Sequence, residues 1–119
     1  MEMDLSKFGY EMFFKDYQIH ALRYLWSIEG GANSRAVWEQ VNRRLQGTIS
    51  RASIINFLNN VVDEGILRYE ERTGKGGHYR IYYHNYDETQ LREHLANYII
   101  TRLFEEFPEE TRKAIETTS

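Results

Sequence analysis

The apolar residues of this chain change their spacing at Gly65, and that change limits the folds open to it. Before Gly65 they recur every three or four positions, as on the buried side of an α-helix. After it, the segments ILRYEER (66–72) and HYRIYYH (78–84) are rich in β-branched and aromatic residues, which favour strands. The glycine-rich segment TGKGG (73–77) between them predicts a hairpin connection.

Three helices are predicted before Gly65, each from a capping residue followed by an apolar stripe. The expected N-caps are Asp16, Ser34 and Ser50, and the expected last residues are about Ser27, Leu45 and Glu64. The expected core positions are Ile19, Leu22, Leu25, Trp26, Val37, Trp38, Val41, Leu45, Ile54, Phe57, Leu58 and Val61.

A long helix is predicted after the hairpin, in DETQLREHLANYIITRLFEEF (87–107). Asp87 and Gln90 form a capping-box pattern at its start, and Pro108 is expected to end or kink it. Near the N-terminus, Phe8, Met12 and Phe13 are expected to form a short helix that packs on the core or on a partner chain.

This order predicts a mainly α chain with a small β-hairpin, arranged as a winged helix-turn-helix. Such a fold has a three-helix core plus a wing, and here it carries a long C-terminal dimerisation helix. The expected divisions are an N-terminal extension (1–14), a winged-helix DNA-binding domain (15–85), and a C-terminal dimerisation helix and tail (86–119).

Charge is segregated along the chain, although the net charge is only −3. Residues 34–80 hold eight basic and five acidic side chains, whereas both flanking segments are acidic. A central basic segment fits a surface that faces phosphates, and chance segregation is the alternative.

The outward face of the third predicted helix carries small and amide side chains where Lys and Glu are usual. Asn pairs with adenine through two hydrogen bonds, and Arg reaches guanine or a phosphate. Alternatively, this face is only a solvated helix surface. Ile55 is a separate case, because it lies beside the apolar stripe and is expected to pack at its edge. The residues expected to contact DNA from this helix are Ser50, Arg51, Ser53, Asn56 and Asn60.

The hairpin adds a basic, glycine-rich tip that suits a phosphate backbone or a minor groove. The residues expected to contact DNA there are Lys75 and His78, with Arg72 and Arg80 beside them. Glu70 and Glu71 dilute this charge, and a plain hairpin that closes the core is the alternative.

The last predicted helix has a wider apolar surface than one neighbour covers, which favours a two-fold homodimer. The alternative is that residues 1–14 cover part of this surface within one chain. The residues expected at the dimer interface are Leu91, Leu95, Ile99, Ile100, Leu103, Phe104 and Phe107.

No catalytic site, metal site or cofactor site is expected. The chain has no cysteine, and its four histidines are scattered. TGKGG lacks the spacing and the following helix of a phosphate-binding loop. The N-terminus does not fit a secretory signal and no apolar run suits a membrane span, so a cytoplasmic location is expected.

Three stretches resemble the penicillinase-repressor family of winged-helix regulators: YQIHALRYLW (17–26), NSRAVWEQVN (33–42) and TISRASIINFLNNVVDEGIL (48–67). The segment that leads from the third predicted helix into the hairpin, which forms the wing, is also similar to that of MarR-type regulators. The resemblance implies a homodimeric repressor that binds palindromic operators and dimerises through C-terminal helices. The absence of cysteine departs from the copper-responsive members, and the long wing departs from the penicillinase repressors.

The sequence therefore predicts a DNA-binding transcriptional regulator, a homodimeric repressor on double-stranded DNA. Its effector is not identified by any motif. The alternative function is a winged helix that contacts other proteins of the transcription machinery without reading DNA.

Overall fold

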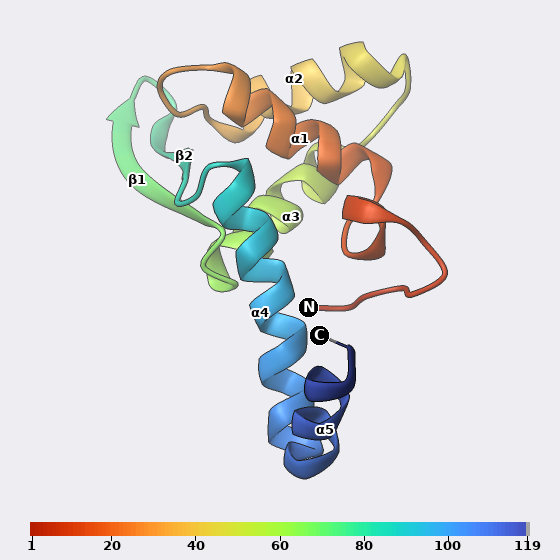
Figure 1. The fold of residues 1–119 in the computed structure, drawn as a ribbon. Helices are drawn as coiled ribbons and strands as arrows, with labels where there is room; N and C mark the ends of the chain where they lie inside the picture. The colour runs from red at the N-terminus through yellow and green to blue at the C-terminus, as the bar shows by residue number, and fades with distance from the viewer. Residues whose placement is uncertain (119) are drawn as a thin grey trace. The chain divides into compact units, whose positions relative to one another are not determined.

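The computed structural model describes residues 1–118, and the chain divides into two compact units. The first unit is Met1–Asn85 and the second begins at Tyr86. The elements, shown in Figure 1, are η1 (Gly9–Met12), α1 (Asp16–Ser27), α2 (Ser34–Leu45), α3 (Arg51–Asp63), β1 (Leu67–Gly74), β2 (Gly77–His84), α4 (Glu88–Glu106) and α5 (Pro108–Thr118). The predicted class, mainly helical with a small antiparallel hairpin, is confirmed, and this order is compatible with a winged helix.

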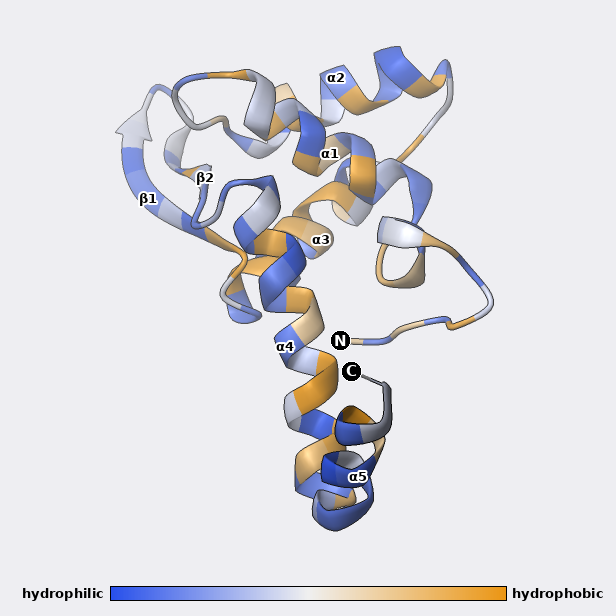
Figure 2. Ribbon diagram, in the orientation of Figure 1, coloured by the Kyte–Doolittle hydropathy of each residue, from blue (hydrophilic) through white to orange (hydrophobic). Residues whose placement is uncertain are grey.

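The core of the first unit forms where α1, α2 and α3 pack against one another and α3 packs against β1. Each helix alternates apolar and polar segments along its length (Figure 2), as an amphipathic helix does. Most of the predicted stripe is buried, and only Trp26, Trp38 and Leu45 are half-buried. The buried helix residues are Ile19, Ala21, Leu22, Leu25, Val37, Val41, Ile54, Phe57, Leu58 and Val61.

Two of the three predicted N-caps are displaced by one residue. The N-cap of α1 is Lys15, and its backbone N–H donates to Gln18 Oε1 (2.8 Å). Asp16 is therefore the first helical residue and not the cap. Asn33 caps α2 by accepting from the Ala36 N–H (2.8 Å), so Ser34 is not the cap. An N-cap residue has an extended backbone, and its side chain accepts from the backbone N–H three residues later. Asn33 meets both conditions.

The hairpin connection is shorter than predicted. The β1–β2 register runs from Leu67 opposite His84 to Gly74 opposite Gly77, which leaves Lys75 and Gly76 as the turn. Gly77 has a φ of 98°, a conformation that L side chains rarely adopt. The glycines of TGKGG therefore extend the strands to a tight tip, and the expected five-residue connection is wrong.

The segment that follows α1 pairs with β2, which the sequence did not predict. The Ala32 N–H donates to the Tyr82 carbonyl (3.1 Å), and the Tyr82 N–H donates to the Ala32 carbonyl (2.9 Å). These two bonds attach the base of the hairpin to the helical core.

In the second unit, α4 ends at Glu106 and Pro108 is the first residue of α5. Proline suits this position because its fixed φ matches a helix and the first turn needs no N–H donor. The buried Thr111 joins the two helices, since its hydroxyl donates to the Leu103 carbonyl (3.1 Å). The expected tail after Pro108 is therefore a second helix as far as Thr118, and α4 and α5 form a helical hairpin.

Before α1 the chain forms a compact loop that contains η1. The Asp4 N–H donates to the Met12 carbonyl (2.7 Å) and closes this loop. Phe14 at its end is buried and makes an edge-to-face contact with Phe57 of α3, with ring centroids 6.1 Å apart. The short helix expected of Phe8, Met12 and Phe13 corresponds to the four-residue 3-10 helix η1, which contains only Met12 of the three, and Phe8 just before it is exposed.

Candidate nucleic-acid interface

The exposed face of α3 is polar and carries no acidic side chain before Asp63. Arg51, Ala52, Asn56 and Asn60 are exposed, whereas Ile54, Phe57, Leu58 and Val61 on the other side are buried. Within residues 1–118, no hydrogen bond or ion pair occupies the side chains of Arg51, Asn56 or Asn60. These three polar groups are therefore open to a ligand. Ile55 is half-buried, as expected for edge packing.

A cluster of hydrogen bonds fixes the backbone just before α3. Asn42 of α2 accepts from the Ile49 N–H (2.7 Å) and donates to the Ile49 carbonyl (3.1 Å). The Trp38 indole N–H donates to the same carbonyl (2.7 Å). Ile49 is thus held on both its donor and its acceptor, and the start of α3 is placed relative to α2. We call Trp38, Asn42 and Ile49 the α2–α3 clamp.

Ser50 caps α3, as the sequence predicts. Its hydroxyl oxygen accepts from the Ser53 N–H (3.1 Å), and its hydroxyl lies 2.9 Å from that of Ser53. Both serines expected to contact DNA therefore already hydrogen-bond to each other. Their established structural role is to start the helix.

Asn59 joins α3 to the hairpin. Its Oδ1 accepts from the Tyr82 hydroxyl (2.7 Å) and from Arg80 Nη1 (3.1 Å). Burial raises the pKa of the Tyr82 hydroxyl, which therefore remains protonated as the donor. Arg80 also lies over the Tyr69 ring, 4.0 Å from its centroid, and 3.8 Å from Glu71. Asn59 thus sets the position of the hairpin beside α3.

The hairpin cations fall into two groups. Arg68, Arg72 and Arg80 have partners in the protein: Arg68 donates to the His84 carbonyl (2.6 Å), and Arg72 donates to Glu70 (3.3 Å). Lys75 and His78 at the tip are exposed, and no acidic side chain of the described chain pairs with them. The tip is therefore the part of the hairpin whose basic side chains are available to phosphates.

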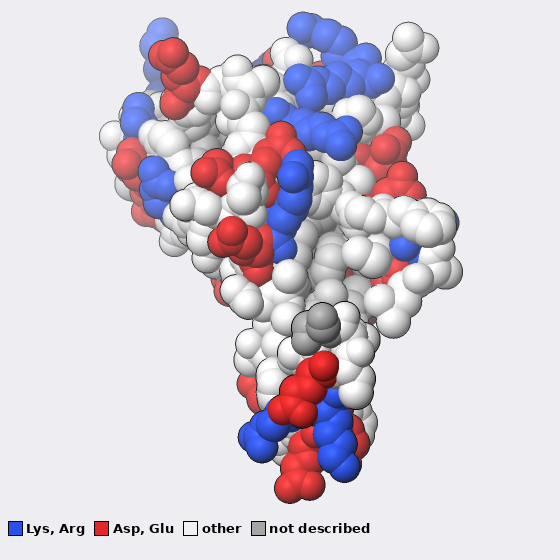
Figure 3. Space-filling model, in the orientation of Figure 1, with Lys and Arg blue, Asp and Glu red and all other residues white. Residues whose placement is uncertain are grey.

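Further basic side chains lie on the helices of the first unit. Figure 3 shows Lys and Arg side chains gathered over α1 and α2. Arg35 forms an ion pair with Glu39 (3.2 Å), and Arg44 lies 6.0 Å from the centroid of the Tyr24 ring. Arg43 is exposed and, within the described residues, has no such partner.

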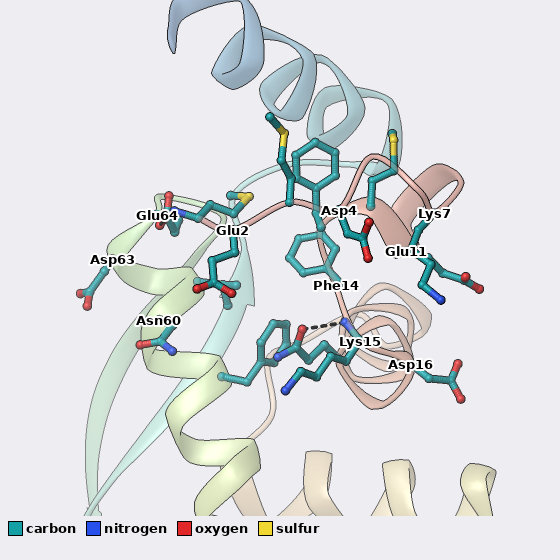
Figure 4. A pocket seen from close by; sticks show the side chains of 17 residues that line it. Glu2, Asp4, Lys7, Glu11, Phe14, Lys15, Asp16, Asn60, Asp63 and Glu64 are labelled. Carbon is teal, nitrogen blue, oxygen red and sulfur yellow. Dashed lines mark hydrogen bonds and ion pairs between the residues drawn. The ribbon is translucent and has the colours of Figure 1, made fainter.

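The structure thus brings Arg51 and Asn56 of α3 and the hairpin tip into one unit, with Asn59 as the link between the two elements. Asn60 points elsewhere: it lines a cavity next to the N-terminal segment (Figure 4). Sequence reasoning missed Asn42 and Asn59 as positioning residues. Asn59 belongs to the amide-rich face of α3, and this unusual composition is a sequence feature that could have pointed to it. Asn42 has no such feature, because its sequence context is that of an ordinary solvated helix residue.

The seven residues expected at the dimer interface differ in exposure. Leu91 and Leu95 are buried, and Ile99 and Phe104 are half-buried. Ile100 and Leu103 are exposed in the second half of α4, Phe107 is exposed directly after it, and Ile115 of α5 is exposed as well. The exposed apolar side chains of the second unit therefore lie on the α4–α5 hairpin, and Leu5 and Phe8 of the first unit are exposed as well.

Comparison with known proteins does not identify this chain. No family model matches it, and no curated protein does. No helix within residues 1–118 is long and apolar enough to cross a membrane. The resemblance to the penicillinase repressors therefore remains a prediction from the three stretches quoted above.

Proposed function

We propose that this chain is a sequence-specific DNA-binding transcriptional regulator of the winged helix-turn-helix type, a homodimeric repressor on a palindromic operator. The observation that carries the proposal is the exposed face of α3. It is polar, lacks acidic groups up to Asp63, is fixed at its start by the α2–α3 clamp, and stands beside a hairpin with available basic side chains at its tip.

In this proposal α3 enters the major groove. Ala52 is small and lets the helix backbone approach the base edges. Asn56 pairs with adenine through its N6 and N7 edge, and Arg51 binds guanine or a phosphate. Lys75 and His78 bind the phosphate backbone next to the wing, which sets the register of the protein on the duplex.

The charge of the two units supports the same orientation. Residues 1–85 carry eleven basic and ten acidic side chains, whereas residues 86–118 carry four basic and eight acidic. The acidic excess of the chain thus belongs to the second unit, and it does not oppose phosphate contact by the first. Phosphate contacts of this kind weaken as salt rises, because binding releases counterions.

Selection of bound duplexes from a random DNA pool, followed by binding measurements at several salt concentrations, tests the proposal. We expect one enriched, two-fold symmetric motif and an affinity that falls steeply with salt. A chain that binds no duplex even at low salt would instead support the protein-contact alternative, for which the exposed Tyr69 and Tyr79 of the hairpin are the candidate surface.

Two substitutions separate base reading from phosphate contact. Asn56→Ala should weaken binding to the selected site by about 1–3 kcal/mol and relax the preference at one base pair, because a bidentate contact to a base is lost. Lys75→Ala should weaken binding to all duplexes about equally. Binding titrations on the selected site and on a scrambled one measure both effects. Asn97→Ala, at an exposed position of α4, is the matched control and should leave binding unchanged. If Asn56→Ala and Lys75→Ala weaken binding to both duplexes equally, Asn56 does not read a base.

The homodimer proposal rests on the exposed apolar side chains of the α4–α5 hairpin. A two-fold dimer would bury them and place two α3 helices on successive major grooves. We expect a dimeric mass by sedimentation at micromolar concentration, and a monomeric mass for Leu103→Glu. Leu5→Glu makes the same change at another exposed leucine and should leave the dimer intact. A monomeric parent protein would reject this part of the proposal.

A further inference from the structure

A cavity of about 960 Å³ lies in the first unit, between the N-terminal segment, the start of α1 and the second half of α3. Figure 4 shows Phe14 at its base and Glu2 extending from the N-terminal segment into the gap toward α3. This volume suits a drug-sized organic molecule, since ligand pockets in proteins usually measure about 300–1,000 Å³. None of the residues to which the proposed function assigns a DNA contact lines this cavity, whereas Asn60 does line it.

The wall formed by the N-terminal segment is held in place by its own hydrogen bonds. The Asp4 N–H donates to the Met12 carbonyl (2.7 Å), and Ser6 donates to the Asp4 carboxylate from its N–H (2.9 Å) and its hydroxyl (2.6 Å). These two bonds from Ser6 hold the pKa of Asp4 below its ordinary value, so its carboxylate is charged at neutral pH. The cavity therefore has an ordered wall with a fixed negative charge.

The apolar part of the lining is formed by methionines and phenylalanines. All three methionines of the chain, Met1, Met3 and Met12, line the cavity. Methionine side chains adapt to ligands of different shape because they are unbranched and polarisable. Phe13, Phe14 and Phe57 form a continuous aromatic cluster, with centroids 6.3 Å apart for the first pair and 6.1 Å apart for the second.

The charged part of the lining is strongly acidic. Six carboxylates line the cavity against two lysines, Lys7 and Lys15, and the N-terminal ammonium of Met1, which forms an ion pair with Glu64 (3.2 Å). Aromatic faces attract cations through their quadrupole, and carboxylates attract them by charge. A small metal ion is not the expected ligand, because no three metal-binding side chains converge anywhere in residues 1–118. The lining instead combines a large apolar surface with a diffuse negative field.

We propose that this cavity binds a hydrophobic organic cation, such as a quaternary ammonium or phosphonium compound with an aromatic or alkyl body. The body packs against the methionines and phenylalanines, and the positive centre lies among the carboxylates of the rim. Neutral molecules lose the electrostatic part of this attraction, and anions are repelled. The proposal concerns the isolated protein, and it does not depend on whether the chain binds DNA.

The probe is tetraphenylphosphonium, and the matched control is tetraphenylborate, an anion of the same shape. Calorimetric titration into the full chain should give a dissociation constant on the order of 1–100 µM for the cation. The anion should show no measurable binding. In protein labelled with ¹³C at the methionine methyl groups, the methionine signals should shift with the cation, since the cavity contains every methionine of the sequence.

A double substitution tests the acidic rim. Glu2→Gln with Asp4→Asn removes two charges, while Asn keeps an oxygen that accepts from Ser6. We expect roughly fivefold to tenfold weaker binding of the cation, as for two exposed charge pairs. Glu109→Gln with Glu110→Gln changes the net charge equally in α5 and should leave binding unchanged. Equal binding of the two probes, unshifted methionine signals, or equal losses in both double variants would overturn the proposal.

Discussion

Replacing Asn42 with alanine is expected to lower the free energy of unfolding by about 2 kcal/mol, because the Ile49 N–H, in a half-buried turn, loses the one acceptor that it has within residues 1–118. The Ile49 carbonyl loses the bond from Asn42 but keeps the bond from the Trp38 indole, so the α2–α3 clamp is lost at the Ile49 N–H and only weakened at its carbonyl. Chemical denaturation followed by circular dichroism measures the change in stability. Hydrogen exchange adds a local measurement, since the Ile49 amide should exchange faster in the variant.

The matched control for Asn42 is Gln40→Ala on the same helix. Gln40 is half-buried like Asn42, but its side chain makes no hydrogen bond within residues 1–118. Its replacement should change the stability by no more than about 0.5 kcal/mol. Equal losses from the two variants, or an unchanged exchange rate at Ile49, would show that the clamp does not hold the start of α3.

Replacing Gly31 with alanine is expected to cost about 2–3 kcal/mol through overpacking. A Cβ at this position would lie 2.5 Å from the Tyr82 carbonyl oxygen, 2.6 Å from Ile81 Cγ2 and 2.7 Å from Tyr83 Cε1. One of these neighbours is backbone, which cannot rotate away as a side chain end can. The strain therefore acts on the two hydrogen bonds between Ala32 and Tyr82 and loosens the base of the hairpin. Thermal unfolding should shift by roughly 6–15 °C to lower temperature.

Gly30→Ala is a control one residue away. A Cβ at Gly30 meets no atom within 4 Å, so its effect should be small or slightly stabilising. Neither glycine has a φ in the left-handed region, so the two variants differ in steric contact and not in backbone preference. Accelerated exchange of the Tyr82 amide in Gly31→Ala alone would locate the strain at the hairpin base. Similar stabilities for the two variants would contradict the close approach.

The helices were predictable from local spacing. Ile54, Phe57, Leu58 and Val61 recur at helical intervals, and all four are buried. Ser50 and Asp87 were recognised as caps because a short polar side chain preceded each stripe, and both accept from the expected N–H groups. The displaced cap at Asn33 arises because two capping residue types, Asn33 and Ser34, are adjacent, and composition alone does not determine which one adopts the extended backbone. Lys15 is not a capping residue type, and its side chain makes no cap bond.

The candidate interface was only partly predictable. The polar face of α3 and the basic tip of the hairpin are visible in the sequence, because each is a local run of residues. The contact between Arg80 and Asn59 is not visible there, because the two residues lie 21 positions apart in the chain. Sequence also left α5 unassigned, since a proline after a long helix ends it in some chains and starts a new helix in others.

By itself, the sequence determined α1 to α4, the two strands of the hairpin and the absence of acidic side chains on most of the exposed face of α3, because periodicity, capping and charge are local properties of the chain. Only the tertiary structure decided that Asn42 and Asn59 hold α3 and the hairpin in position, that Gly31 must lack a side chain, and that three methionines share one cavity. Each depends on contacts between residues distant in the chain, and such contacts exist only after the core has brought the elements together.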